Sequence, residues 1–321
     1  MGPSSRPIVG PLVSVLVPCH NGELYLAECL ESALAQSHRP IEIIFVDDGS
    51  TDGSLATARA YESRGVRVLT RANGGQSAAL NTALAAVSGK YIQFLDSDDV
   101  LDPGKISAQV ALLENADPAA IASGAWARFG AKISEAAFMA EPVWRNFVPV
   151  DWLVESWSGG GMMHVAAWLI PRTIVERAGP WVEPLRWAAN LDAHFFTRAL
   201  LASSICLFCP EAKSYYRSGH PAMSSWRSRR SLEASLSVLL ETGDALLEAE
   251  ASPRTRRAFA DNLQRFVYST YPESRDLVAL AERRIRQLGG SNLPFAAGPT
   301  VLAVSRYCGW KAAKRLRRLA R

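Results

Sequence analysis

Three carboxylates within four positions follow a short apolar segment of the chain. Asp96, Asp98 and Asp99 come directly after Tyr91–Leu95, whose side chains are typical of a buried strand. Carboxylates do not enter a core unless a cation compensates their charge. Hard cations such as Mg²⁺ take oxygen ligands, usually one or two carboxylates together with substrate phosphates. The pattern therefore predicts a strand that ends at a Mg²⁺ or Mn²⁺ site outside the core, and the alternative is an acidic loop that only ends a strand.

An alternation of strands and helices in the first hundred residues positions these carboxylates. Strands are predicted at 13–17, 41–46, 66–69 and 91–95, and helices at 23–36 and 78–87. This order implies an α/β fold with a doubly wound, mostly parallel sheet, whose ligands bind outside the carboxyl ends of the strands. Unusual residues fall at all four of these ends, in segments 18–21, 47–51, 71–75 and 96–99. The sequence therefore predicts one ligand crevice along this edge of the sheet.

The crevice lacks the two common phosphate-binding loops. Its first turn, residues 18–22, reads Pro-Cys-His-Asn-Gly, which matches neither Gly-x-Gly-x-x-Gly nor a P-loop. Phosphates would then be neutralised by a metal, with help from Arg71 and the backbone amides near Gly74 and Gly75. We therefore expect a nucleotide whose charge is met at the later strand ends.

Two further acids, Asp47 and Asp48, end the second predicted strand. Carboxylate oxygens only accept hydrogen bonds, so these acids suit the N–H edge of a base or the hydroxyls of a ribose. The alternative is a helix N-terminus that carries acids, which would explain Asp52 better than the adjacent pair.

Four ordered motifs resemble those of family 2 glycosyltransferases, which have the GT-A fold. The motifs are Pro18–Asn21, Val46–Asp52, Asn73–Asn81 and Phe94–Asp99, and the resemblance covers about residues 12–220. It implies that a sugar passes from a nucleotide-diphosphate donor (a UDP, dTDP or GDP sugar) to an acceptor hydroxyl, in the synthesis of a polysaccharide or glycolipid. The implied nucleotide-sugar contacts are Pro18, His20, Asn21, Asp47, Asp48, Arg71, Gly75, Asn81, Asp96, Ser97 and Asp98, and the implied metal ligands are Asp98 and Asp99. The family often has an arginine where this chain has Leu80, which affects the expected contacts to the donor phosphates or sugar.

A candidate general base lies in the second half of the chain. Asn190 is expected to cap a helix whose first turn contains Asp192. By the same resemblance, an acid at this place deprotonates the acceptor hydroxyl, which predicts transfer with inversion at the anomeric carbon. The family more often has Glu-Asp or Gly-Asp where this chain has Leu191-Asp192. The alternative is that Asp192 only favours the helix dipole, which would lower its pKa, and His194 is then the second candidate.

Aromatic and sulfur-containing residues of the second half allow two interpretations each. Seven of the nine tryptophans lie between Trp126 and Trp187, where they could contact sugar rings or form the core of a second layer. The segment 159–161, Gly-Gly-Gly, predicts a mobile loop beside the site, and His164 is either a structural histidine or a ligand. Cys206 and Cys209 are expected to be buried thiols, because no second Cys pair or neighbouring His supports a zinc or redox site.

The 321-residue chain is predicted to divide into four parts. These are a flexible N-terminus at 1–11, a catalytic domain at 12–220 (nucleotide-sugar half 12–113, acceptor half 114–220), a helical extension at 221–297 and a basic tail at 298–321. The tail contains seven Lys or Arg and no acid, so it is a candidate for an anionic membrane surface, with Trp310 in the headgroup region. No apolar run could span a bilayer, and the N-terminus lacks the apolar core of a signal peptide. We therefore expect a cytoplasmic protein, peripheral at the inner face of the membrane, and no nucleic-acid partner.

The sequence thus favours a metal-dependent, inverting glycosyltransferase. One alternative is a non-catalytic nucleotide- or sugar-binding protein on the same fold. A nucleotidyltransferase would need a basic cradle for a triphosphate in the first turn, and residues 18–22 contain no Lys or Arg.

Overall fold

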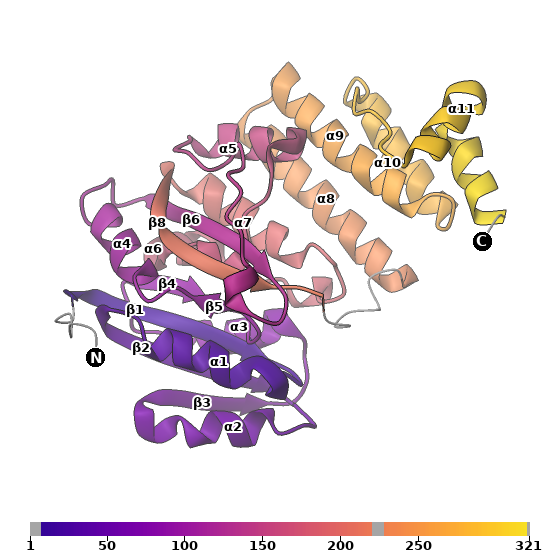
Figure 1. Cartoon of the computed structure of the whole chain (residues 1–321). Coiled ribbons are helices and arrows are strands. Elements are labelled where there is room, and N and C mark those ends of the chain that lie inside the picture. Colours follow the sequence, from indigo (N-terminus) through magenta and orange to yellow (C-terminus); the bar gives the residue numbers. More distant parts are fainter. Residues whose placement is uncertain (1–7, 220–227, 320–321) are drawn as a thin grey trace.

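The computed structural model describes residues 8–219 and 228–319 of the chain. Four parts of the predicted division lie partly outside these ranges: the flexible N-terminus, the end of the acceptor half, the start of the helical extension and the last two residues of the tail. A five-stranded sheet contains four strands of the first half and one short strand of the second half (Figure 1). Its strands are β1 (Ile8–Cys19), β2 (His38–Asp48), β3 (Val66–Arg71), β4 (Tyr91–Phe94) and β7 (Ile170–Pro171). The order is β3-β2-β1-β4-β7; the first four strands are parallel, and β7 is antiparallel to β4. The predicted α/β fold with a mostly parallel sheet is therefore confirmed, and β1 includes residues 8–11 of the segment expected to be flexible.

Alternating side chains of these strands build two apolar layers. Helices α1 (Glu23–Leu34) and α2 (Ser54–Ala60) pack in one layer with Val13, Val15 and Val17 of β1. Leu16 faces the other layer, which contains α3 (Gln76–Leu84). This division follows from the two-residue period of a strand, which sends neighbouring side chains to opposite faces. Both faces of β1 are thus covered, as a central parallel strand requires.

A second, three-stranded sheet carries the other half of the site. It has the order β5-β8-β6, with β5 (Val100–Leu101) antiparallel and β6 (Ala120–Phe129) parallel to the long β8 (Ile205–Arg217). The helices of this half are α4 (Lys105–Leu113), α5 (Pro149–Glu155), α6 (Arg172–Ala178) and α7 (Leu191–Ala202). Short helical turns occupy Glu62–Arg64, Ile133–Glu135, Ser156–Gly160, Val165–Ala167 and Glu183–Leu185.

Most of the clustered tryptophans belong to the core of this half. Five of the seven are buried, namely Trp126, Trp152, Trp157, Trp168 and Trp181. Trp181 stacks on Phe195 of α7 with ring centroids 4.4 Å apart, and Trp168 stacks on Phe196 at 5.5 Å. The core interpretation therefore holds for these five, while Trp187 is 39% exposed. Cys206 and Cys209 are buried free thiols, as predicted.

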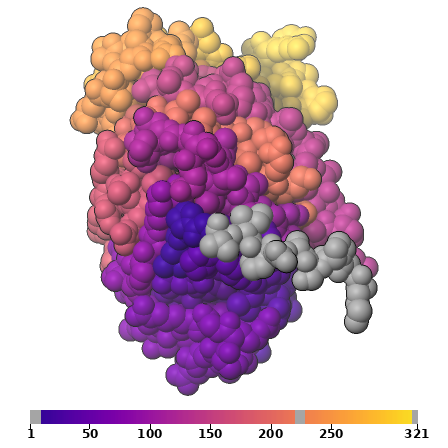
Figure 2. Space-filling view, turned by 90° about the vertical axis from the view of Figure 1, so that its left-hand side faces the viewer, coloured from indigo at the N-terminus to yellow at the C-terminus, as the bar shows by residue number. Residues whose placement is uncertain are grey.

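Four helices form the C-terminal part, drawn in orange to yellow in Figure 1. They are α8 (Arg229–Ala249), α9 (Pro253–Thr270), α10 (Arg275–Gln287) and α11 (Pro299–Leu319). Ser252 and Thr255 form a reciprocal capping box at the start of α9, which fixes where that helix begins. Figure 2, turned by 90°, shows the N-terminal half at the bottom of the molecule and the C-terminal helices at the top. None of the helices in the described ranges is long and apolar enough to cross a membrane.

The basic tail is more closely attached than its sequence indicates. Gly309, with φ at 78°, interrupts α11 and lets its second part turn. The next residue, Trp310, packs edge-on against Tyr268 and Tyr271 of α9 and its end, with centroids 4.9 and 5.3 Å apart. The ring of Trp310 thus docks α11 onto α9, and binding of the tail to a membrane surface stays a prediction.

Candidate active site

The polar ends of the parallel strands meet in one crevice, as the sequence predicts. His20 Nδ1 lies 3.0 Å from the carbonyl oxygen of Asp48 and 3.0 Å from the side-chain amide nitrogen of Asn73. Asn21 has φ at 54° and donates its backbone N–H to Ser50 at 3.0 Å. Pro18 is buried and pairs in register with Val46 of β2. Parallel pairing brings these ends together because every strand of the group stops at the same edge.

Asp48 organises the loop after β3. Its buried carboxylate, 2% exposed, accepts hydrogen bonds from the amides of Gly74 at 3.0 Å and Gly75 at 2.7 Å, and Arg71 Nε lies 3.1 Å away. Arg71 and these amides were expected to neutralise phosphate, but Asp48 already occupies them. Asp47 is also buried, and it accepts two long bonds of 3.3 Å from the amide of Ser50. Both acids thus stabilise the walls of the crevice.

Asn81 has a positioning role that differs from the predicted donor contact. Its amide exchanges two hydrogen bonds of 2.9 Å with the backbone of Trp181, and it also donates to Glu183 at 3.1 Å. These bonds tie α3 to the segment that leads into α7. Leu80 beside it is 1% exposed and packs in the core, so it adds no cation where the family often has one.

Asp99 lies deeper than expected. It is fully buried, and its carboxylate accepts hydrogen bonds from His164 Nε2 at 2.6 Å and from the amide of Arg217 at 2.8 Å. The expectation that this end of the strand lies outside the core is therefore wrong for Asp99, since β8 and the segment around His164 cover it. Asp96 is less buried and accepts from Gln76 Nε2 at 2.8 Å. An added side-chain atom on Gly22 would lie 2.9 Å from Ser97 Oγ, so Ser97 lines the first turn.

Four carboxylates form one electrostatic cluster. Burial raises the pKa of Asp96 well above its usual value, and the negative charges of Asp99, Asp98 and Asp192 raise it further. A bound divalent cation would offset this repulsion. Asp192 is separated from the others by more than 90 residues of sequence, so only the tertiary structure brings it here.

The donor atoms fit a divalent cation. One ligand atom each from Asp96, Asp99 and His164 lie within 4.8 Å of one another. The two carboxylates are ligands that Mg²⁺ and Mn²⁺ sites use, whereas an imidazole ligand is more typical of transition metals. Within the described residues His164 Nδ1 is buried without a hydrogen-bond partner, which leaves the tautomer of this ring unfixed from that side. The sequence named Asp98 and Asp99; the geometry adds Asp96 and His164 and places Asp98 beside this group rather than in it.

Arg217 is the functional residue that the sequence interpretation missed. It is 3% exposed at the end of β8, donates its backbone amide to Asp99, and donates Nε to the carbonyl oxygen of Asp98 at 2.9 Å. Its guanidinium also pairs with Glu28 and lies 4.2 Å from the ring of Tyr25. Arg217 therefore holds the acidic loop in shape. The available signal in the sequence was an arginine at the end of a long strand, but the sequence does not show which segment that arginine contacts.

Asp192 lies in the first turn of α7 and faces the acidic cluster. Burial raises its pKa above the usual value, although hydrogen bonds from the backbone amides of Ala193 and Asp192, and the nearby His164, oppose this rise. The alternative in which the helix dipole lowers the pKa is therefore wrong, because burial outweighs the dipole. Asn190 occupies the N-cap position without a side-chain capping bond, and its Nδ2 instead contacts the carbonyl oxygen of Ser235 at 3.5 Å.

His194 does not share the crevice. It is 7% exposed, and its Nε2 lies 3.0 Å from Glu241 of α8. Two positions along a helix rotate a side chain by roughly 200°, so His194 points away when Asp192 faces the acids. The second candidate for the base is therefore excluded by geometry.

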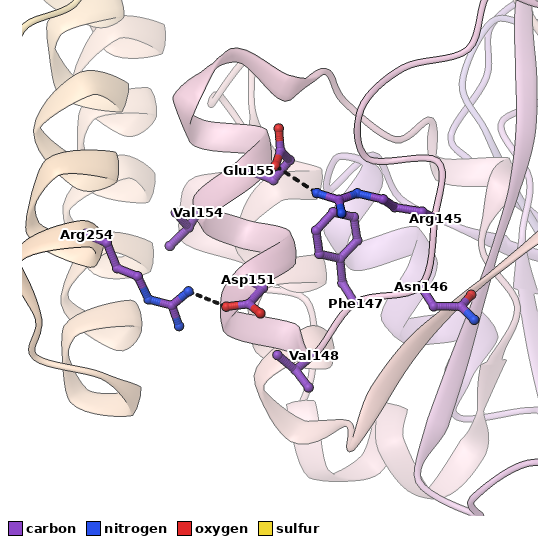
Figure 3. A pocket seen from close by; sticks show the side chains of 8 residues that line it. All are labelled: Arg145, Asn146, Phe147, Val148, Asp151, Val154, Glu155 and Arg254. Carbon is purple, nitrogen blue, oxygen red and sulfur yellow. Dashed lines mark hydrogen bonds and ion pairs between the residues drawn. The ribbon is translucent and has the colours of Figure 1, made fainter.

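A pocket of about 350 Å³ lies at the other end of β8 (Figure 3). Its charged residues neutralise one another, because Arg145 pairs with Glu155 at 3.2 Å and Arg254 pairs with Asp151. Phe147, which lines it, pairs with Cys206 near the start of β8. Arg217 lies eleven positions further along β8 than Cys206, which is roughly 35 Å. This pocket is therefore remote from the acidic cluster.

Comparison with known proteins agrees with this geometry. Residues 14–152 match the family described as Glycosyl transferase family 2. An uncharacterized glycosyltransferase of Rickettsia prowazekii is 31% identical over 193 residues, which are 59% of this chain and 59% of that protein. The uncharacterized glycosyltransferase EpsJ of Bacillus subtilis is 47% identical over 91 residues, or 28% of this chain and 26% of EpsJ. The chain thus spans about 59% of the length of the first of these relatives.

Solved structures share the fold at low identity. Residues 1–349 of S. aureus TarS in complex with UDP-GlcNAc superpose with a TM-score of 0.68 at 19% identity, covering 86% of this chain and 81% of that one. The mannosyltransferase PcManGT from Pyrobaculum calidifontis, in complex with GDP-Man and Mn²⁺, gives a TM-score of 0.55 at 18% identity, covering 98% and 84%. At these identities the likeness concerns the fold.

Proposed function

We propose that the protein, whose residues 14–152 match the family described as Glycosyl transferase family 2, transfers a sugar from a nucleotide-diphosphate donor to an acceptor hydroxyl, with inversion at the anomeric carbon. The observation that carries the proposal is the position of Asp192 beside the acidic loop after β4. Asp192 could accept a proton at this place while the strand-end loops of the same crevice hold the nucleotide-sugar donor. The similar folds that bind UDP-GlcNAc or GDP-Man support a donor of this class.

The strand-end loops would hold the nucleotide. Pro18, His20 and Asn21 form one wall of the crevice, and Asp48 keeps the loop with Gly75 on the other. Arg71 is paired with Asp48, whereas the exposed Arg186 lies against Gly75 and donates Nη1 to the carbonyl oxygen of Gly74 at 3.1 Å. Charge on the donor phosphates would therefore be met at Arg186 and at the acidic loop.

Asp96, Asp99 and His164 would hold Mg²⁺ or Mn²⁺, with Asp98 beside them. When bound, the ion neutralises charge on the leaving diphosphate. Arg217 and Gln76 keep two of these carboxylates in place through hydrogen bonds. The buried and mutually repelling carboxylates support a cation here, because an uncompensated cluster is costly.

Asp192 would take the proton of the acceptor hydroxyl as that oxygen attacks the anomeric carbon. Its raised pKa makes it a stronger base than an ordinary surface aspartate. The bond from the anomeric carbon to the diphosphate oxygen breaks as the new glycosidic bond forms, and attack from the opposite face gives inversion.

A panel of UDP, dTDP and GDP sugars tests the proposal. A donor that binds the folded chain should raise its melting temperature, and more so with Mn²⁺ or Mg²⁺. Release of the nucleotide diphosphate, with or without an added glycan, should then require the same metal. Binding without release of nucleotide diphosphate would instead favour a non-catalytic nucleotide- or sugar-binding protein. Release of pyrophosphate from a nucleoside triphosphate would favour a nucleotidyltransferase.

A further inference from the structure

A second pocket, of about 390 Å³, is lined in part by residues that neighbour the candidate base in sequence. Its walls come from three parts of the chain: the glycine loop (Ser156, Trp157, Gly159, Gly161), the start of α7 (Asn190, Ala193) and the C-terminal helices (Leu239, Asn262, Arg265). Asn190 and Ala193 lie on either side of Asp192 in sequence, and Gly161 precedes His164 by three residues. Three residues span at most about 11 Å. The pocket is therefore within one or two sugar rings of the acidic cluster.

Arg265 is the charged side chain of this pocket. It is half-buried on α9, donates Nη1 to the carbonyl oxygen of Trp157, and forms no ion pair with a carboxylate within the parts of the chain that the structure describes. Gly159, with φ at 106°, lets the guanidinium approach, since an added side-chain atom there would lie 3.3 Å from Nη2. Burial lowers the pKa of Arg265, and the more distant Asp261 only partly offsets this. A partly buried cation without a carboxylate is unusual, because such charges are normally paired.

The same pocket contains a second polar group whose hydrogen-bonding capacity is not filled. Oδ1 of Asn190 is buried and accepts no hydrogen bond from any described residue. Nδ2 of this side chain lies 3.5 Å from the carbonyl oxygen of Ser235. Asn262 adds a further amide to the lining. A hydroxyl-bearing ligand with one anionic group would satisfy the free acceptor and the unpaired cation together.

We propose that this pocket is the acceptor subsite and that it selects an acceptor with an anionic group, phosphate or carboxylate, which Arg265 binds. The inference rests on the proposed function, since it supplies the acceptor for the base Asp192. It also gives the C-terminal helices a role: α8 and α9 contribute Leu239, Asn262 and Arg265 to substrate selection. Acceptors without an anionic group would leave the guanidinium buried and unpaired, which disfavours them.

Calorimetric binding to the full chain tests the proposal with three probes: a glycerol-phosphate oligomer, a galacturonate oligosaccharide and a neutral malto-oligosaccharide. We expect one anionic probe to bind and the neutral one to bind at least tenfold more weakly. Arg265→Gln should weaken the anionic probe at least tenfold, and Arg265→Lys should keep most of the binding because it keeps the charge. Arg256→Gln is the matched control, since Arg256 is exposed on the opposite face of α9.

The outcomes separate the two proposals. Three outcomes would each overturn the acceptor assignment. The neutral probe could bind as tightly as the anionic ones, neither anionic probe could bind, or Arg265→Gln could leave binding of the anionic probe unchanged. Should Arg265→Gln fail to fold, Ala193→Leu fills the pocket without changing the arginine and must also abolish binding. Nucleotide-sugar binding is measured on the same variants by thermal shift and should not change. Its absence in the wild-type chain would count against the proposed function alone.

Discussion

Replacing Asp192 by Asn removes the proposed base with little change of shape. The side chain keeps its size and its ability to accept hydrogen bonds from the start of α7, but it can no longer take a proton. Burial raises the pKa of Asp192, which means that the charged carboxylate destabilises the folded state. The variant should therefore fold at least as stably as the wild type, and any loss of activity can be read as a loss of catalysis.

The expected loss follows from the role assigned. Removal of a positioned general base lowers the rate by about 10²–10⁴-fold, which corresponds to about 3–5 kcal/mol in the activation barrier. The interactions with the donor come from the strand-end loops, so the affinity for the nucleotide sugar should stay within about twofold. The raised pKa also predicts that wild-type transfer falls as pH drops through that pKa, because the protonated acid cannot act as a base.

Steady-state transfer by Asp192→Asn and by His194→Gln, with donor affinity measured by calorimetry, provides the assay. His194 is two residues away and pairs with Glu241 outside the crevice, so its variant should transfer at nearly the wild-type rate. Transfer by Asp192→Asn within tenfold of the wild type would refute the assignment. A large loss in donor affinity would show that Asp192 supports the donor instead.

Three further changes test other parts of the structure. Asp99→Ala leaves the donors of His164 and Arg217 buried without their acceptor, so urea denaturation should show a loss of about 2–4 kcal/mol in the free energy of unfolding; an unchanged midpoint would contradict this. Asp96→Asn removes one of four carboxylates that repel one another. The raised pKa of Asp96 destabilises the folded protein at every pH above the pKa of this group in the unfolded chain. The metal-free variant should therefore melt at a higher temperature than the wild type at pH 7, and this gain should disappear at acidic pH. The chain should pellet with anionic but not neutral vesicles, less so in high salt, if residues 298–321 bind an anionic inner membrane surface; a chain that ends at residue 297 should stay in solution, and equal behaviour of both would remove this role.

The sequence by itself determined the parallel half of the fold and the edge where its ligands bind. Strand and helix periods are local, and mostly apolar runs that end before Pro18, Asp47 or Asp96 place polar side chains at strand ends whatever the rest of the chain does. Parallel pairing then makes those ends coincide, as the contacts of His20 with Asp48 and Asn73 show. Asp192 could also be named from its place at the start of a helix.

Only the tertiary structure decided which of these side chains are free to act. Arg71 and the amides of Gly74 and Gly75 looked available for phosphate, but Asp48 binds them in a contact set by the turn after β3. Burial of Asp99 depends on β8, which crosses from more than 100 residues away and brings the amide of Arg217. Hydrogen bonds and burial between distant segments leave no periodic trace in a sequence. The unpaired Arg265, which lines a pocket with Asn190 at the start of α7, is likewise visible only once α9 is packed against the glycine loop, because the sequence alone cannot show which charges lack a partner.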